Sequence, residues 1–273
     1  MRARATPCVL RRSLRVIPCG TEAAARCLAG VTVIALSKHR CIDDTPKDYI
    51  CPKGANKMKY NTIIFDLDGT ILNTLDDLCD SVNHALKECG YPVRTIDEVR
   101  SFVGDGIAKL IERSAPQGTD SESLAKLHLE FTQYYKQHCA DKTRPYDGIV
   151  PLLGKLSSMG LKVAVVSNKA DYAVKLLCRD YFPELLDMAI GEREGIRRKP
   201  HPDSVLEVME SLGADRSTTV YVGDSDVDVQ TAKNAGVDCV AVSWGFRSKG
   251  FLCEHGATVI AESADELFSV LIG

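Results

Sequence analysis

The chain has 273 residues, of which 45% are hydrophobic and 26% charged, and this ordinary globular composition excludes a disordered or fibrous protein. Its longest clearly apolar run, residues 28–36, is too short for a membrane span, which needs roughly 20 residues. The net charge of −3 combines +7 in residues 1–57 with −10 in the remainder, and so acidic a body should repel nucleic acid. We therefore expect neither nucleic acid nor a membrane as a partner.

Residues 1–57 differ from the rest of the chain because they are rich in arginine and lack helical or strand periodicity. Such a composition is typical of a transit peptide, and a secretory signal around residues 28–36 is a weaker alternative because its basic lead is long. Met58 stands directly before a strand pattern, as an initiator methionine would. We favour upstream translation over organelle targeting for this extension, and we expect the folded protein to be cytoplasmic.

The cysteines agree with a reducing compartment. Eleven cysteines are scattered along the chain, their number is odd, and no C-x-x-C pair occurs. A disulfide scaffold or a zinc site would need paired or regularly spaced cysteines, so we expect free thiols.

Four short apolar runs predict buried strands of a parallel sheet. They span residues 61–65, 161–166, 219–222 and 239–242. Apolar stripes at helical spacing lie between them, for example at residues 149–156 and 205–212. Because strands that alternate with helices form βαβ units, we expect a doubly wound, Rossmann-like α/β core made of residues 58–73 and 144–273.

Residues 74–143 interrupt this alternation with three helical stripes and no strand-like run. The stripes consist of Leu75, Leu78, Val82 and Leu86, then Ile107, Leu110 and Ile111, then Leu124, Leu127, Phe131 and Tyr134 or Tyr135. We predict that this segment is an all-helical cap domain, inserted after the first strand and lying over the strand ends.

Several polar residues stand just after the predicted strands or just before a predicted helix. They are Asp66, Asp68, Ser167, Asn168, Lys199, Asp224 and Asp228. Carboxyl ends of parallel strands meet at one edge, so we expect these side chains to converge. Two carboxylates ~4 Å apart repel by about 4 kcal/mol at an effective dielectric of 20. Mg²⁺ would supply the counter-charge and keep positions open for phosphate.

The spacing of Asp66 and Asp68 suits phosphoryl transfer. The turn at Gly69 lets both carboxylates face one substrate, so that one attacks as a nucleophile while the other donates and later accepts a proton. Lys199 would neutralise charge on a carboxylate and on the phosphoryl group, and Ser167 would hold phosphate oxygens.

Taken together, these segments resemble the four motifs of the haloacid dehalogenase superfamily, in the same order. The motifs are Asp66-Leu-Asp-Gly-Thr70, Ser167, Lys199 and Gly223-Asp-Ser-Asp-Val-Asp228. The sequence Asp-Gly-Thr-Ile-Leu-Asn-Thr and Phe102-Val-Gly-Asp-Gly-Ile107 are most similar to the phosphoglycolate phosphatase group. The resemblance covers essentially Met58 to Gly273.

The resemblance implies a magnesium-dependent phosphatase acting on a small phosphorylated metabolite, with 2-phosphoglycolate as the lead candidate. It makes Asp66 the nucleophile, which forms an aspartyl phosphate and binds the metal. It makes Asp68 the acid that protonates the leaving oxygen and then activates water, with its main-chain carbonyl on Mg²⁺. By the same resemblance, the phosphate and the attacking carboxylate are held by Thr70, Ser167, Asn168 and Lys199. The metal is bound by Asp224 and supported, directly or through water, by Asp228.

Other functions remain open at this point. The same residues could act on pyrophosphate, a nucleoside monophosphate or a sugar phosphate, whereas a phosphomutase is disfavoured because Thr70 stands where that branch usually has a hydrophobic residue. A non-catalytic phospho-ligand binder or a receiver-like domain is a further alternative, although receivers have no helical insert. The oligomeric state is left open.

The loop Gly104-Asp105-Gly106 leads to a separate prediction. Two glycines around an acid form a tight loop with exposed amides, and the helix that follows offers its N-terminus to an anion. We expect this loop to face the cleft and to select the leaving group of the substrate.

Overall fold

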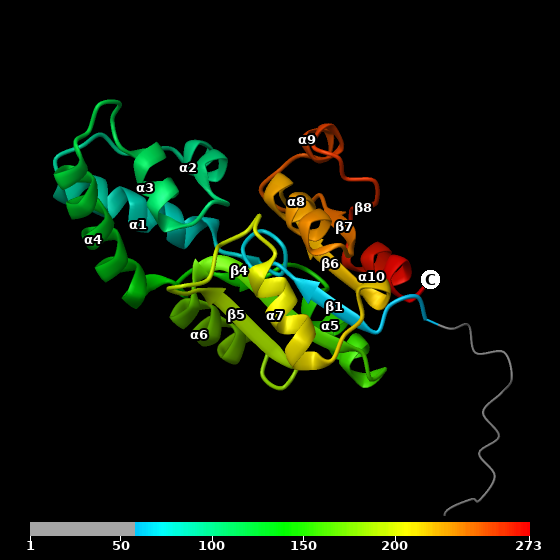
Figure 1. Ribbon diagram of the computed structural model, residues 1–273. Helices are drawn as coiled ribbons and strands as arrows, with labels where there is room; N and C mark the ends of the chain where they lie inside the picture. Colours follow the sequence, from blue (N-terminus) through cyan, green and yellow to red (C-terminus); the bar gives the residue numbers. More distant parts are fainter. Residues whose placement is uncertain (1–57) are drawn as a thin grey trace, which may run out of the picture. The chain divides into compact units, whose positions relative to one another are not determined.

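A computed structural model describes residues 58–273 of the chain (Figure 1). The expectations for residues 1–57, upstream translation or targeting, therefore lie outside the described residues. None of the helices within residues 58–273 is both long enough and apolar enough to span a bilayer.

Six strands form one parallel sheet, in the order β5-β4-β1-β6-β7-β8. They are β1 (Thr62–Phe65), β4 (Lys162–Ala170), β5 (Met188–Glu192), β6 (Thr219–Gly223), β7 (Asp238–Val242) and β8 (Ile260–Ala261). Strand β1 lies between β4 and β6, and Phe65 is level with Val165 and Val222. Whatever follows these three residues therefore reaches the same edge of the sheet.

Helices cover both faces of the sheet (Figure 1). Helices α5 (Ile149–Ser158), α6 (Asp171–Tyr181) and α10 (Ala264–Ile272) contribute to one apolar cluster, and α7 (Asp203–Leu212) and α8 (Asp226–Ala235) to the other. Successive strand residues point to opposite faces, so Phe65 joins the first cluster and Ile64 the second. The doubly wound α/β fold predicted from the sequence is confirmed. Helix α9 (Lys249–Glu254) lies between β7 and β8.

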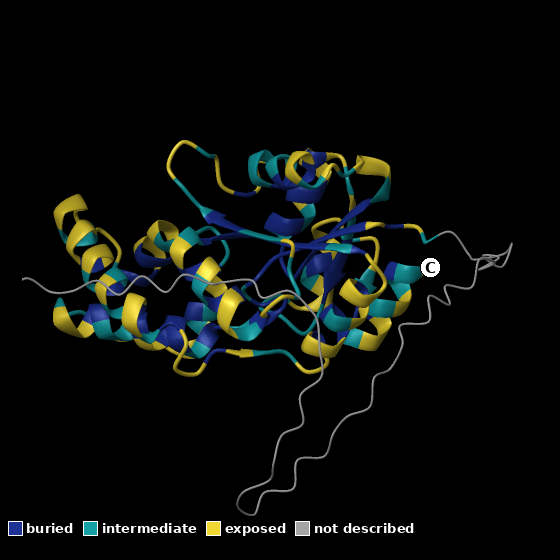
Figure 2. Ribbon diagram, turned by 90° about the horizontal axis from the view of Figure 1, so that it is seen from below, coloured by how far each residue is buried: buried dark blue, intermediate teal, exposed yellow. Residues whose placement is uncertain are grey.

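Four helices separate β1 from α5. They are α1 (Leu75–Glu88), α2 (Ile96–Phe102), α3 (Ile107–Ser114) and α4 (Ser121–His138). Their inward sides are buried (Figure 2) and belong to the same apolar cluster as one face of the sheet. Helix α2 has too few apolar residues for its periodicity to be visible in the sequence. It begins at Thr95, whose hydroxyl accepts from the Glu98 N–H while the Glu98 carboxylate accepts from the Thr95 N–H.

The chain enters and leaves this helical segment at neighbouring points. Strand β2 (Leu72–Asn73) pairs antiparallel with β3 (Arg144–Pro145). We draw the boundaries of the cap, residues 74–143, at this pair of short strands.

Strand β4 is longer than its apolar run. It continues through Ala170 with a register shift between Val166 and Ala170 relative to β5. Ser167 and Asn168 therefore lie within the strand rather than after it, and the irregular pairing turns their polar side chains toward the edge where the site forms.

Candidate functional site

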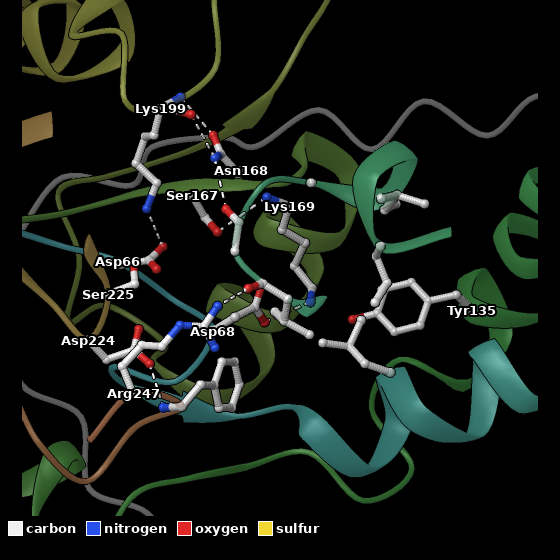
Figure 3. Close-up of a pocket in the computed structure, with 17 residues that line it drawn as sticks. Asp66, Asp68, Tyr135, Ser167, Asn168, Lys169, Lys199, Asp224, Ser225 and Arg247 are labelled. Atoms are coloured by element: carbon white, nitrogen blue, oxygen red, sulfur yellow. Dashed lines mark hydrogen bonds and ion pairs between the residues drawn. The ribbon is translucent and has the colours of Figure 1, made fainter. Parts of the chain in front are cut away.

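A cavity lies at the carboxyl edge of the sheet, between the sheet and the cap helices (Figure 3). The sequence-predicted residues that line it are Asp66, Asp68, Ser167, Asn168, Lys199 and Asp224, with Gly104 and Gly106 of the cap loop. Residues more than 150 positions apart in the chain thus meet in one place, because β1, β4 and β6 are neighbours in the sheet.

The turn after β1 places Asp66 and Asp68 against Asp224. Gly69 has a φ of +84°, and a Cβ there would lie 2.3 Å from Asp224 Oδ2. Gly245 approaches from the other side, where a Cβ would lie 2.3 Å from the Gly69 carbonyl oxygen. Only glycine fits at these two positions, so the backbone itself forms the wall around the Asp224 carboxylate.

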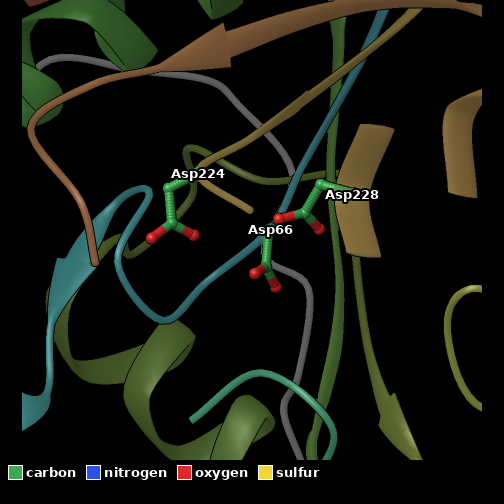
Figure 4. Close-up of side chains that lie close together, drawn as sticks. All are labelled: Asp66, Asp224 and Asp228. Carbon is green, nitrogen blue, oxygen red and sulfur yellow. The ribbon is translucent and has the colours of Figure 1, made fainter. Parts of the chain in front are cut away.

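Three buried carboxylates gather at the base of the site (Figure 4). Oxygens of Asp66, Asp224 and Asp228 all lie within 4.8 Å of one another. Burial and, to a lesser extent, the neighbouring acids raise the pKa of Asp66 to about 7, although the nearby Lys199 opposes the rise. Burial also raises the pKa of Asp224 well above its ordinary value, with Asp228 and Asp66 adding to the rise. The cluster is short of positive charge.

Lys199 is the cation that faces this cluster. Its ammonium is buried and lies 2.9 Å from Asp66 Oδ1, 2.7 Å from Asp228 Oδ1 and 3.1 Å from the Tyr221 hydroxyl. Burial alone would lower its pKa, but Asp228 and Asp66 raise it well above the usual value. Lys199 is therefore held as a permanent cation against the predicted nucleophile.

The donor set fits a hard divalent cation. Asp66 Oδ1 is buried, and within residues 58–273 the Lys199 ammonium, 2.9 Å away, is the one donor close to it. Asp224 accepts a strong hydrogen bond from the Phe246 N–H, 2.6 Å, and a longer one from Thr70. Carboxylate oxygens of this kind are the ligands that Mg²⁺ prefers.

The Asp228 carboxylate has more hydrogen-bond and ion-pair partners than the other two carboxylates. Besides the ion pair with Lys199, its Oδ2 accepts from the Ser225 hydroxyl at 2.6 Å and from the Ser225 N–H at 3.1 Å. Its carboxylate is completely buried and does not line the cavity. This arrangement fits support of a metal through water better than direct ligation.

Asp68 has a partner that the sequence analysis missed. Lys169 is buried, and its ammonium lies 2.8 Å from Asp68 Oδ1. A signal was available, because Lys169 stands two residues after Ser167 in the same strand and alternate residues point the same way. The pair keeps the Asp68 carboxylate at the cavity wall.

The Asn168 side chain is occupied by backbone groups. Its Nδ2 donates to the carbonyls of Gly104 and Lys199, at 3.1 and 3.0 Å, and its Oδ1 accepts from the Lys199 N–H at 2.8 Å. The side-chain amide therefore ties the cap loop to the Lys199 segment, and the contact with phosphate stays a prediction.

Two arginines, also missed from the sequence, hold the cap loop from the core. Arg247 donates to the carbonyls of Arg100 and Val103, at 2.8 and 2.7 Å, and lines the cavity. Arg198 donates to the Asp105 carbonyl at 2.9 Å. From the sequence alone, an arginine in a loop is most simply interpreted as a solvent-exposed charge. These two find their backbone acceptors only because the cap packs against the core.

Three predicted residues do not line the cavity. Thr70 is fully buried and donates to Asp224, Asp228 lies behind Lys199, and the Asp105 carboxylate pairs with Arg113 at 2.6 Å. Of the cap loop, the two glycines face the cavity and the acid does not.

The family model for haloacid dehalogenase-like hydrolases matches residues 63–242. The phosphoglycolate phosphatase of Pseudomonas syringae is 33% identical over 211 residues, 75% of this chain and 77% of that protein. The N-acetylmuramic acid 6-phosphate phosphatase of Pseudomonas aeruginosa is 31% identical over 218 residues, 79% of this chain and 96% of that protein.

A crystal structure from Lactobacillus delbrueckii subsp. bulgaricus, described as a candidate phosphoglycolate phosphatase, superposes with a TM-score of 0.76 at 39% identity. The match covers 79% of this chain and 100% of that one. Family match, relatives and structural neighbour agree with the order of motifs and with the sheet edge at which they meet. The chain belongs to the haloacid dehalogenase-like hydrolases and is a phosphatase of that family.

Proposed function

We propose that the protein is a magnesium-dependent phosphatase that hydrolyses a small phosphomonoester through an aspartyl phosphate, with 2-phosphoglycolate as the lead substrate. The observation that carries this proposal is the position of Asp66, which faces the cavity with Lys199 at 2.9 Å and with Asp68 on the same turn. The names of two relatives, both phosphatases of small phosphorylated compounds, support it.

In this proposal Asp66 attacks the phosphorus atom while Asp68 gives a proton to the leaving oxygen. Asp68 then removes a proton from water, which attacks the phosphorus of the aspartyl phosphate and releases Asp66. Lys199 stays charged throughout and offsets the charge of both the nucleophile and the phosphoryl oxygens.

The phosphoryl group would be held by groups from β4. Ser167 lines the cavity beside Asp66, and its hydroxyl is placed to donate to a phosphoryl oxygen. Asp66 and Asp224 would hold Mg²⁺, with the Asp68 carbonyl and Asp228 in support. The ion would neutralise the clustered carboxylates and polarise the phosphoryl oxygens.

The space for the leaving group favours a small substrate. The cavity has a volume of about 50 Å³, and the cap loop is tied to the core by Asn168 and Arg247. A two-carbon leaving group suits this space better than an amino sugar, so phosphoglycolate is preferred over a sugar phosphate.

Turnover of p-nitrophenyl phosphate by the full chain tests the proposed reaction. We expect hydrolysis that requires added Mg²⁺ and that falls at least about 1,000-fold in Asp66→Asn and in Asp68→Asn, because each change removes a group that reacts. Asp226→Asn is the matched control, since Asp226 stands in the same motif as Asp224 but does not line the cavity. Stoichiometric labelling without release would instead indicate a receiver-like protein.

A further inference from the structure

The hydroxyl of Tyr135 is an unpaired polar group inside the cavity. Tyr135 comes from cap helix α4, its side chain is 1% exposed, and its hydroxyl donates to no acceptor within residues 58–273. Figure 3 shows this hydroxyl pointing into the cavity, toward the Lys169 ammonium. Buried hydroxyls without a partner are rare because they lose their hydrogen bonds to water. The position therefore suits a ligand atom that accepts a hydrogen bond.

Lys169 has donors to spare at the same place. Its ammonium, 4.9 Å from the centre of the Tyr135 ring, carries three hydrogens, and one of them is directed at Asp68. Within residues 58–273 Asp68 is its one acidic partner, so Lys169 keeps hydrogens for a further acceptor beside the Tyr135 hydroxyl. A group bound between Tyr135 and Lys169 would thus receive hydrogen bonds from both.

The rest of the cap wall is apolar. The cap residues that line the cavity are Leu78, Val103, Gly104, Gly106, Ile107, Leu110 and Tyr135. Tyr135 has the one polar side chain among these described cap residues. Among these described cap residues no side chain carries a carboxylate, so a negatively charged ligand group meets no like charge on this wall.

The lining of the cavity carries one cation without an acidic partner within residues 58–273. Lys169 and Asp68 compensate each other, while the Arg247 guanidinium donates only to backbone carbonyls and has no acidic partner in the described part of the chain. The base of the site, with Asp66, Asp224 and Asp228, is negative. With the divalent cation of the proposed function bound at that base, a substrate would place its phosphate there and a single negative charge toward the cap.

We propose that Lys169 and Tyr135 bind a carboxylate on the leaving group of the substrate, so that the enzyme selects phosphate esters of small hydroxy acids. This inference rests on the proposed phosphatase activity and adds the residues that choose among its substrates. A carboxylate accepts from the Tyr135 hydroxyl and from a free hydrogen of Lys169, and Arg247 supplies the long-range compensating charge.

The test compares two substrates that differ only in the carboxylate: 2-phosphoglycolate and 2-hydroxyethyl phosphate. The full chain is assayed with Mg²⁺, and the ratio of the two kcat/KM values is measured. We expect the wild-type protein to prefer phosphoglycolate, and Tyr135→Phe to reduce this ratio by about 10- to 100-fold through KM, the usual effect of one hydrogen bond to a charged group. Tyr134→Phe is the control, because Tyr134 stacks on His84 and His138 and does not line the cavity.

A structural role for Tyr135 would slow both substrates alike and leave the ratio unchanged, and this result would overturn the inference. A wild-type protein that hydrolyses phosphomonoesters without preferring the carboxylate would also overturn it, while leaving the proposed phosphatase intact. Absence of any hydrolysis that depends on Asp66 would overturn both this inference and the proposed function. Thermal unfolding of each variant separates loss of the hydroxyl from loss of the fold.

Discussion

The side-chain amide of Asn168 and the backbone of Lys199 form a reciprocal pair of hydrogen bonds, in which Nδ2 donates at 3.0 Å and Oδ1 accepts at 2.8 Å. Both residues are buried, so neither backbone group has water as an alternative. This pair fixes the loop before α7 on the end of β4, and it thereby sets where the Lys199 ammonium meets Asp66. The same Nδ2 also donates to the Gly104 carbonyl, so the Asn168 amide connects the Lys199 segment to the cap.

We expect Asn168→Ala to lower the free energy of unfolding by about 2–4 kcal/mol, because three buried backbone groups lose their partner. Turnover should fall about 10- to 100-fold as Lys199 loses its fixed position. Urea unfolding and steady-state kinetics measure the two effects. Asn234→Ala is the control, since the exposed Asn234 donates to the adjacent Pro200 carbonyl at 2.7 Å. Equal effects of the two substitutions would show that the pair does not position Lys199.

Lys169→Gln should lower the free energy of unfolding by about 3–5 kcal/mol, because the Asp68 carboxylate stays largely buried without its cation. Lys175→Gln breaks an exposed ion pair with Asp171 and should cost less than about 0.5 kcal/mol. Denaturant unfolding of the two variants compares the pairs directly. Similar midpoints would mean that the Lys169–Asp68 contact contributes nothing to stability.

Gly245→Ala should disable the site by steric conflict. Its Cβ would lie 2.3 Å from the Gly69 carbonyl oxygen and 2.4 Å from Asp224, so the carboxylate proposed to bind Mg²⁺ must move. We expect a loss of about 1–3 kcal/mol in stability and a weaker response to Mg²⁺. Gly250→Ala, with open space around its Cβ in α9, should be neutral or slightly stabilising. The prediction is wrong if both alanine variants bind and use Mg²⁺ like the wild-type protein.

Magnesium should stabilise the protein independently of substrate. A cation that binds only the folded state, present at a concentration of 100 times its Kd, raises the free energy of unfolding by about 2.7 kcal/mol. Differential scanning fluorimetry detects this as a higher Tm. Asp224→Asn should abolish this shift. Without the ion, however, it should raise Tm, because one of three mutually repelling carboxylates has gone. Asp226→Asn should keep the wild-type response, and an unchanged Mg²⁺ shift in Asp224→Asn would exclude this residue as a ligand.

Much of the site could be predicted because its residues adjoin short apolar runs. Asp66 directly follows one such run, and Asp224 follows another after Gly223. Because the two strands are neighbours in the parallel sheet, both acids reach the same edge whatever the details of the loops. The helical segment could be recognised for a similar reason, since its apolar stripes keep helical spacing over several turns.

The contacts that depend on packing between distant segments could not be predicted. Arg247 reaches a carbonyl 147 positions away, and Lys169 reaches an acid 101 positions away, so no local pattern records either contact. The family resemblance assigns Thr70 to the phosphate, and the two glycines around Asp105 predict a loop that faces the cleft. In a tight turn, the backbone dihedral angles decide whether a side chain faces the cavity or a neighbouring side chain. The spacing of residues in the sequence does not specify these angles.

The most direct test of the account is to identify the residue that carries the phosphoryl group during turnover. The full chain is mixed with Mg²⁺ and 2-phosphoglycolate, quenched in acid within one turnover, digested and analysed by mass spectrometry. We predict one added phosphoryl group on the peptide that contains Asp66, absent from Asp66→Asn. Rapid hydrolysis without a phosphorylated peptide, or with the group on another residue, would contradict the account.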